Sequence, residues 1–347
     1  MRVKGDDLLH RYTLAVGKFR FFVLAVVTWL FFCSTSAALA AEESPDLRIV
    51  KFWVGKNVYE VNGKEYSMDS APVVDIQAGR LLMPLRYLAY SLGITDSDIE
   101  FKKNTAGSID EIIVRRPSEG GFRDTLQMFI GQPDFIVNGG EAGTLDALPR
   151  IDNGRTLVPY RSAAQALGAL VFWDAAERAV VVKTWNRVPS PANPSWSKVI
   201  LYPGLQKIDR IGVGGTADSL KTKVPVAING SDGITQFNVI DYLHAWGVPA
   251  QNILYDQRGG LMVRGAAGAN IPGQPYRAGF IYFYAGEGCG WISNNHKTNP
   301  DEGVLANEIK NGQLYSAMPL FYAIGPLFGK QVEGNVSADS LWLRLIS

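Results

Sequence analysis

The chain has 347 residues, of which 47% are hydrophobic and 11% aromatic, and its formal net charge is +1. This length predicts two or three domains, each large enough to bury a core. The near-neutral charge gives no strong field for binding nucleic acid or anionic lipid, so nucleic-acid-binding classes are disfavoured.

The first 40 residues are predicted to be a secretory signal peptide. Five basic residues precede an apolar run over residues 21–32, and a stretch of small residues ends in A-L-A at Ala40. This order is typical of a signal that is cleaved, here after Ala40. The alternative is an uncleaved anchor, because the segment from the apolar run to Ala40 is long enough to span a bilayer. A lipoprotein site at Cys33 is disfavoured, since two bulky Phe residues stand directly before it.

Export would place the protein outside the cytoplasmic membrane, secreted or associated with the cell envelope. Cleavage would remove five basic and two acidic residues, which leaves 29 against 31 and a net charge of −2. It would also remove Cys33, so that Cys289 stands alone and no internal disulfide can form. An exported chain without a disulfide must rely on core burial. The low cysteine content suits a Gram-positive bacterial envelope.

A segment of about 40 residues occurs twice, at residues 54–93 and 130–168. The matching positions are Asn62-Gly63 with Asn138-Gly139, Gly79-Arg80 with Gly154-Arg155, Pro84-x-Arg86 with Pro159-x-Arg161, and Leu92-Gly93 with Leu167-Gly168. A repeat of this size predicts a duplicated supersecondary unit rather than a short solenoid repeat.

Each copy is predicted to end in an amphipathic helix. Apolar residues recur at i, i+3, i+4 and i+7, beginning directly after Pro84 and Pro159. Proline suits the first helical position because its missing N–H is not needed there, and it holds the preceding residue in extended geometry. Gly93 and Gly168 follow each apolar stripe and are expected to cap the helix with positive φ.

The remaining elements of each copy are predicted to be antiparallel strands. Each Asn-Gly pair lies between alternating segments and predicts a two-residue hairpin. Each Gly-Arg pair predicts a turn into a short strand, at residues 81–83 and 156–158. Hairpins are expected after the helices, at residues 99–102 with 111–115 and residues 170–173 with 179–183. The fold class is therefore predicted to be α+β, with a duplicated antiparallel-sheet-plus-helix module.

Arg86 and Arg161 stand in the first helical turn, where a cation opposes the helix dipole at a cost of about 0.3–1 kcal/mol. We expect each guanidinium to offset this cost by bonding strand carbonyls or a carboxylate, which would lock the helix to the sheet. The alternative is an arginine that binds an anion.

These residues carry a family resemblance. The pattern N-G, G-R-x-L-x-P-x-R, L-G and W-D resembles the copper amine oxidase N-terminal-like domain, also called the stalk domain, over residues 50–184. The second copy fits closely and includes Trp173-Asp174, whereas in the first copy Met83 replaces the usual Val and no Trp-Asp pair follows the helix. The resemblance implies a small antiparallel sheet wrapped on a helix, in exported bacterial proteins, beside variable partner domains. It does not imply amine oxidation.

Copper amine oxidase activity is not expected from this chain. A copper site of the amine oxidase type needs three His ligands. The sequence contains only His10, His244 and His296, and His10 lies within the signal. No cofactor and no metal site are predicted.

Residues 185–196 are rich in proline and predict a stiff, extended linker. Residues 197–347 are predicted to form a second α+β domain of unknown function. Its expected elements are strands at 199–202, 208–213, 224–228, 277–284 and 340–346, a hairpin of 252–255 with 261–264, and helices at 235–246 and 299–310. One interpretation of residues 228–264 is a degenerate third copy of the repeat, because the order of their signals is the same.

Catalytic signals in this region are weak. Cys289 and His296 could form a thiol nucleophile and its base, but a glycine-rich turn that holds an incidental small side chain is favoured. His244 is expected to be a packed or surface imidazole. The aromatic residues could form a platform for sugars, although most are expected to be core: Trp185, Trp196, Trp246, Trp291, Trp342, Tyr255, Tyr276, Tyr282 and Tyr284.

The sequence therefore favours an exported, non-enzymatic cell-envelope protein in which the stalk domain is a spacer or a binding module. Its expected partner is a cell-wall polymer or an envelope protein, with no nucleic acid and no membrane span after cleavage. The alternative is an exported hydrolase with its active site in residues 197–347.

Overall fold

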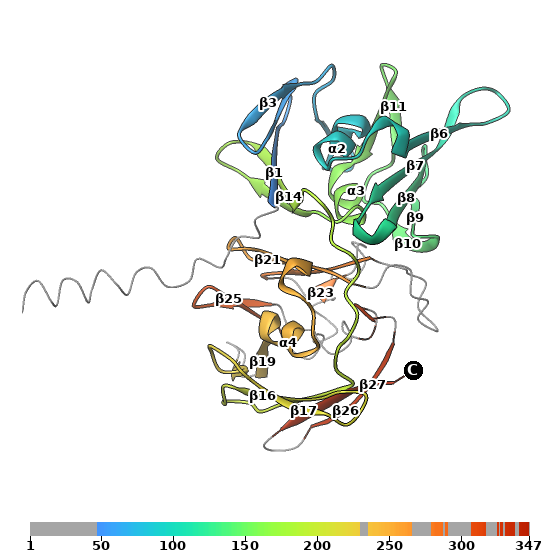
Figure 1. Ribbon diagram of the computed structural model, residues 1–347. Helices are drawn as coiled ribbons and strands as arrows, with labels where there is room; N and C mark the ends of the chain where they lie inside the picture. Colours follow the sequence, from blue (N-terminus) through green and yellow to red (C-terminus); the bar gives the residue numbers. More distant parts are fainter. Residues whose placement is uncertain are drawn as a thin grey trace, which may run out of the picture. The chain divides into compact units, whose positions relative to one another are not determined.

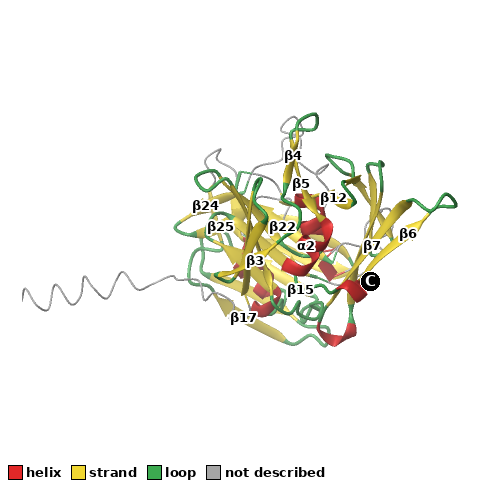
Figure 2. Ribbon diagram, turned by 90° about the horizontal axis from the view of Figure 1, so that it is seen from above, coloured by secondary structure: helices red, strands yellow, loops and turns green. Residues whose placement is uncertain are grey.

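The computed structural model describes residues 47–229, 235–265, 279–286, 289–290, 307–316, 325, 327–328, 330–336 and 340–346. Residues 44–347 form one compact unit. Antiparallel strands dominate the described residues, and the named helices are short (Figure 2). The predicted class was α+β, and the described residues form mostly antiparallel sheets with few helices, which is compatible with that class. The predicted signal, residues 1–40, lies outside the described residues.

The N-terminal half, residues 47–185, contains three antiparallel sheets (Figure 1). The first sheet has the strand order β13-β14-β1-β2-β3, with β1 (Leu47–Trp53), β2 (Val58–Val61), β3 (Lys64–Ser67), β13 (Leu170–Asp174) and β14 (Ala179–Trp185). The second has the order β10-β9-β8-β7-β6, with β6 (Ile99–Lys103), β7 (Ile109–Pro117), β8 (Arg123–Phe129), β9 (Asp134–Val137) and β10 (Gly140–Thr144). The third has the order β11-β12-β5-β4, with β4 (Val73–Asp75), β5 (Arg80–Pro84), β11 (Arg150–Asp152) and β12 (Arg155–Pro159).

Helices α2 (Leu85–Ser91) and α3 (Tyr160–Ala166) directly follow the two inner strands of the third sheet, and short 3-10 turns lie at η1 (Asp96–Asp98) and η2 (Glu119–Gly121). Pro84 and Pro159 have nearly the same extended conformation, with φ −60 and ψ 116 or 110. Each proline ends a strand and stands directly before the first helical residue, one position earlier than predicted, because its ring fixes φ while its ψ is still extended. Gly93 and Gly168 follow the helices with φ 79 and 80. The predicted helices and their glycine caps are confirmed.

The predicted Asn-Gly hairpins are also confirmed. Asn62 and Gly63 have φ 49 and 81 and join β2 to β3, while Asn138 and Gly139 have φ 50 and 78 and join β9 to β10. Two successive positive φ values define the turn whose twist matches antiparallel strands, and Asn-Gly is the pair that adopts it at least cost.

The C-terminal half, residues 198–346, also contains three antiparallel sheets. The first has the order β17-β16-β15-β27-β26, with β15 (Lys198–Leu201), β16 (Lys207–Ile211), β17 (Ala217–Lys221), β26 (Gln331–Val336) and β27 (Leu341–Ile346). The second has the order β20-β21-β22-β23, with β20 (Ile253–Asp256), β21 (Gly260–Arg264), β22 (Phe280–Tyr284) and β23 (Cys289–Gly290). The third has the order β18-β19-β25-β24, with β18 (Ala227–Asn229), β19 (Thr235–Asn238), β24 (Glu308–Lys310) and β25 (Gln313–Ser316). Helix α4 (Val239–Ala245) follows β19, and a 3-10 turn lies at η3 (Ala250–Asn252).

Two predictions in this half are wrong. Residues 235–238 form strand β19 rather than the first turn of a helix, because β19 pairs with both β18 and β25 and buries Gln236 and Phe237. The helix begins only after Asn238, whose side chain accepts a hydrogen bond from the N–H of Asp241 and caps the first turn. Residues 308–310 form strand β24 instead of the end of a helix, because the turn that follows them pairs β24 with β25. Residues 299–306 of that expected helix lie outside the described residues.

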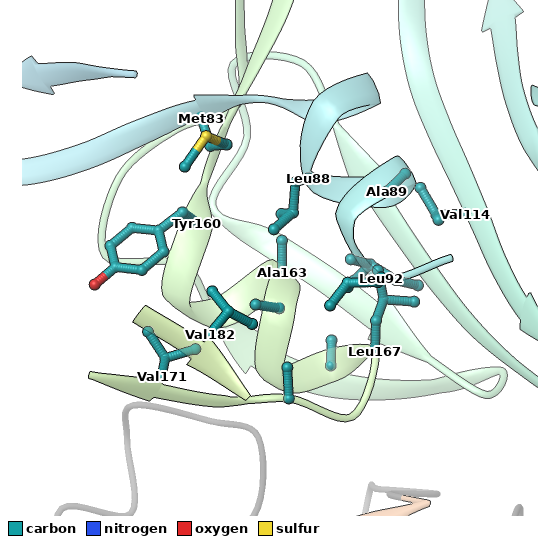
Figure 3. Close-up of a cluster of buried hydrophobic side chains, with 14 of the residues drawn as sticks. Met83, Leu88, Ala89, Leu92, Val114, Tyr160, Ala163, Leu167, Val171 and Val182 are labelled. Carbon is teal, nitrogen blue, oxygen red and sulfur yellow. The ribbon is translucent and has the colours of Figure 1, made fainter. Parts of the chain in front are cut away.

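The main core of the N-terminal half lies around α2 and α3. Figure 3 shows Leu88 of α2 and Ala163 of α3 pointing toward each other among the buried side chains. This core does not end at residue 185, because it includes Leu254, Met262, Phe280 and Tyr282 from the sheet β20-β21-β22-β23. The opposite face of the same sheet packs into the second large core. The sheet is therefore buried on both faces and joins the two halves.

After Trp185, which ends β14, residues 186–196 of the proline-rich segment form no strand; Val188 makes an isolated bridge with Ser118, and the N–H of Ser195 donates to the carbonyl of Trp246. The segment is nonetheless packed, since Val188 and Ala192 are buried and the side chain of Asn252 donates to the carbonyl of Ser190. The segment follows the surface of one compact unit.

Candidate functional site

The arginines of the two Gly-Arg pairs form salt bridges between the two copies of the repeat. Arg80 of the first copy binds Asp146 of the second at 2.5 Å, and Arg155 of the second copy binds Asp69 of the first at 2.5 Å. The hydrogen bond from Arg155 lowers the pKa of Asp69. All four side chains are at least partly exposed, so each pair contributes about 0–1 kcal/mol. These pairs add little stability, but each joins one copy to the other and so constrains their relative orientation.

Gly79 and Gly154 stand directly before these arginines with φ 63 and 74. A residue with a side chain is strained in this region, so glycine at both positions lets the chain turn into β5 and β12. The predicted turns are therefore present, and the motif residues Gly79, Arg80, Gly154 and Arg155 act on backbone shape and on contacts between the copies.

Arg86 lies in the first turn of α2 and pairs with Asp96 at 3.3 Å, with both side chains more than half exposed. Arg161 of α3 interacts with the hydroxyl of its neighbour Tyr160. The expected carboxylate partner is thus found for Arg86, but it belongs to the turn after the helix. A bond from Arg86 to the sheet is not what holds α2 in place.

Two other arginines, which the repeat pattern did not single out, bind the ends of the helices. Arg48 donates to the carbonyl of Ser91 at 3.0 Å, and Arg116 donates to those of Leu167 and Gly168 at 2.5 and 2.9 Å. The last carbonyls of a helix lack internal partners and carry partial negative charge, so a cation satisfies both needs. Burial of Arg116 lowers its pKa to about 10. The signal available in the sequence was the position of Arg116 close to the apolar run of β7, residues 112–114.

Trp173 and Asp174 lie at the end of β13. The Asp174 carboxylate accepts hydrogen bonds from the N–H groups of Ala176 and Glu177, both at 3.1 Å, and closes the hairpin between β13 and β14. The Trp173 side chain is 50% exposed. Asp174 therefore shapes a turn, whereas Trp173 presents an aromatic surface.

A row of aromatic rings runs from the core to the surface in the sheet of β1, β2 and β3. Phe52, Tyr59 and Tyr66 stack in a row across β1, β2 and β3, with ring centroids 5.3 Å apart at each step. The row ends at Tyr66, which is 38% exposed and has Lys64 over its ring. Tyr87 lies against Tyr59, and Tyr90 packs edge-on against Tyr87. Tyr90 donates to Asp96, and burial together with this bond raises the pKa of Tyr90 to about 12. We call Phe52, Tyr59 and Tyr66 the aromatic row.

Charged groups also join the two halves. Asp256, which is 3% exposed, binds Lys183 of β14 and Arg258, both at 2.8 Å. Burial alone would raise the pKa of Asp256, but the hydrogen bonds from Arg258 and Lys183 lower it to about 2. Arg264 binds Asp124 of β8 at 2.9 Å, and both side chains are fully buried.

The weak catalytic candidates are not brought together by the described residues. Cys289 lies on β23 opposite Phe283, and His296 lies outside the described residues. His244 is in the last turn of α4, where burial lowers its pKa. Of the aromatic residues, Trp185, Trp246 and Tyr282 are buried, Trp196 and Trp342 are covered by Arg210 and Lys198, and Trp291 and Tyr276 lie outside the described residues.

Within the described ranges, no group of three or more His, Cys, Asp or Glu side chains is placed to hold a metal ion. None of the helices in those ranges is long and apolar enough to cross a membrane.

A family model, the copper amine oxidase N-terminal domain, matches residues 40–106 and 119–182 of the chain. The two matched segments are consistent with the duplication seen in the sequence. Comparison with curated proteins and with solved structures gives no match.

Proposed function

Because residues 40–182 contain a copper amine oxidase N-terminal domain, we propose that this protein is a non-catalytic stalk protein, exported and held at the bacterial cell envelope, in which a duplicated module serves as a spacer or binding unit. The N-terminal domain of this family is itself a stalk-like part without catalytic function. The proposal extends that role to the whole chain.

The reciprocal pairing of Arg80 with Asp146 and of Arg155 with Asp69 carries the proposal. The arginines shared by the two copies are partly exposed, and each is paired here with a carboxylate of the other copy. A module with this pairing is better suited to be a rigid spacer than a catalytic site. Tyr66, the exposed end of the aromatic row, is the proposed contact residue for a cell-wall polymer, because an exposed aromatic ring can stack on a sugar face.

The test is to express the full chain in a Gram-positive host, fractionate the cells and sequence the N-terminus of the protein recovered. The proposal expects a chain that begins at Ala41 and is found in the envelope or medium. Purified residues 41–347 should pellet with cell walls, and Tyr66→Ala should weaken this pelleting while Phe122→Ala, another exposed aromatic, should not. Recovery of the chain from the cytoplasm with Met1 intact would contradict export. A hydrolytic activity that Cys289→Ala abolishes would favour the hydrolase instead.

A further inference from the structure

The C-terminal half has the same three sheets as the N-terminal half, in the same order along the chain. Reversing the direction in which a sheet is read, β13-β14-β1-β2-β3 corresponds to β26-β27-β15-β16-β17, and β4-β5-β12-β11 corresponds to β18-β19-β25-β24. In the remaining sheet, β6-β7-β8-β9 corresponds to β20-β21-β22-β23, while the edge strand β10 has no counterpart among the described residues. Three independent sheets that share both strand order and chain order leave little room for coincidence.

The registers agree as well. In the N-terminal half, Met83 pairs with Val158 and Pro84 with Leu157. In the C-terminal half, Phe237 pairs with Ser316 and Asn238 with Tyr315. Each pairing joins the two inner strands of its sheet, and Asn238 takes the place of Pro84 as the residue before the helix. Their backbones agree closely, with φ −63 and ψ 117 at Asn238 against φ −60 and ψ 116 at Pro84.

The helix ends match in the same way. Gly93 and Gly247 both have positive φ, and each lies nine residues after the residue that starts its helix. The next residues, Ile94 and Val248, each donate a backbone N–H to the helical carbonyl five positions back, at 3.0 and 3.1 Å. A 3-10 turn and then a strand follow at the same spacing, η1 with β6 and η3 with β20. We infer that residues 198–346 are a second, diverged stalk module, docked on the first.

The docking surface of the second module is one face of the sheet β20-β21-β22-β23. The residues on this face differ in polarity from those at the equivalent positions of the first module. Strand registers make Glu100, Thr125 and Gln127 equivalent to Leu254, Phe280 and Tyr282. In the first module these positions are polar and partly exposed, and the neighbouring Arg115 pairs with Glu100. In the second module they are apolar, buried, and part of the core around α3.

The surface that receives this face lies on β13, β14 and α3 of the first module. Phe172 and Leu170 lie against Gly260, where an added Cβ would come within 2.6 Å of the Phe172 ring. Tyr282 donates to the carbonyl of Gln165, and Phe280 stacks on Trp185. The first module has Glu111 at the position equivalent to Gly260, so only the second module's sheet can approach so closely.

Both free ends of the pair are polar. At the far end of the second module, Glu333, Asn335 and Arg344 occupy the positions of Leu170, Phe172 and Lys183. Glu333 and Arg344 pair with each other and are exposed. In repeat proteins, the terminal units carry polar outer faces, so that no further unit packs on them. The partner that the apolar sheet face fits is therefore a stalk module, and the described residues of this chain form one such contact.

The inference is tested by nicking the intact protein. A site-specific protease sequence inserted after the exposed Asn193 allows the linker to be cut in the folded chain, and the halves are then analysed by size-exclusion chromatography. The nicked wild type should elute as one complex with both fragments. Phe280→Thr with Tyr282→Gln should release the fragments, and so should Phe172→Asn, a milder change on the receiving surface. Circular dichroism before nicking shows that each variant is folded.

Thr125→Ala with Gln127→Ala alters the equivalent positions of the first module and serves as the matched control, which should stay associated after nicking. Wild-type halves that separate as two folded proteins would overturn the inference. So would a control that releases its fragments as readily as the Phe280 and Tyr282 variant, because the two faces would then have the same role. These outcomes are independent of whether the protein is exported, so they are distinguishable from failure of the proposed function.

Discussion

Removal of the buried charge of Arg264 is expected to destabilise the whole protein. The Arg264 guanidinium lies 2.9 Å from Asp124, both side chains are fully buried, and it also covers the Phe280 ring at 4.7 Å. Arg264→Met keeps much of the side-chain volume but leaves the Asp124 carboxylate without its cation. Loss of one partner of a buried pair costs about 3–5 kcal/mol, which is a large part of the roughly 5–15 kcal/mol that holds a typical protein folded.

The assay is urea unfolding of the full chain, followed by tryptophan fluorescence. The double variant Arg264→Met with Asp124→Leu should recover part of the loss, because the pair is then removed whole and the Asp124 carboxylate is no longer left without Arg264. Arg115→Met is the matched control, since Arg115 holds the equivalent strand position and pairs with Glu100 at 2.7 Å in partial exposure. That control should cost about 0–1 kcal/mol. Equal losses in Arg264→Met and Arg115→Met would refute the reasoning.

Three further outcomes are expected. Gly168→Ala should destabilise more than Gly93→Ala, because both have positive φ but only at Gly168 would a Cβ enter the Phe280 ring; equal midpoints in urea would count against this packing. Asp256 has a folded pKa of about 2, below its ordinary value, so its contribution is complete above about pH 5 and is lost as the pH falls toward 2. Asp256→Asn should therefore cost about 2 kcal/mol at pH 7 and flatten the acid limb of a stability titration. Arg80→Ala should cost less than about 1 kcal/mol, with the difference from wild type vanishing at high salt.

Local signals predicted the first half well. Asn-Gly pairs, a proline before each apolar stripe and a glycine after it are each set by backbone sterics within a few residues, so they appear in the sequence as they appear in the fold. The same rules misplaced β19, since Thr235 to Asn238 continue smoothly into a helical pattern and only pairing with β25 keeps them extended. That pairing joins residues almost 80 positions apart, which no local pattern records.

The relation that we infer between the halves had only a faint counterpart in the sequence. The order of signals over residues 228–264 indicated one more copy of the repeat, but the G-R and P-x-R residues that mark the family are absent from it. Asn238 replaces the proline and supplies a side-chain cap instead, so the geometry persists while the motif is lost. The sequence did not indicate the docking face for a related reason. Leu254, Phe280 and Tyr282 are apolar in the second module, whereas the equivalent residues of the first module are polar, so the contact residues do not resemble each other.

The most direct test of the central claim, that two stalk modules form one scaffold, is differential scanning calorimetry of residues 41–347. A shared core built around a sheet that is buried on both faces predicts one transition, with a calorimetric enthalpy close to the van't Hoff enthalpy. Two separate transitions, one for each half, would contradict it.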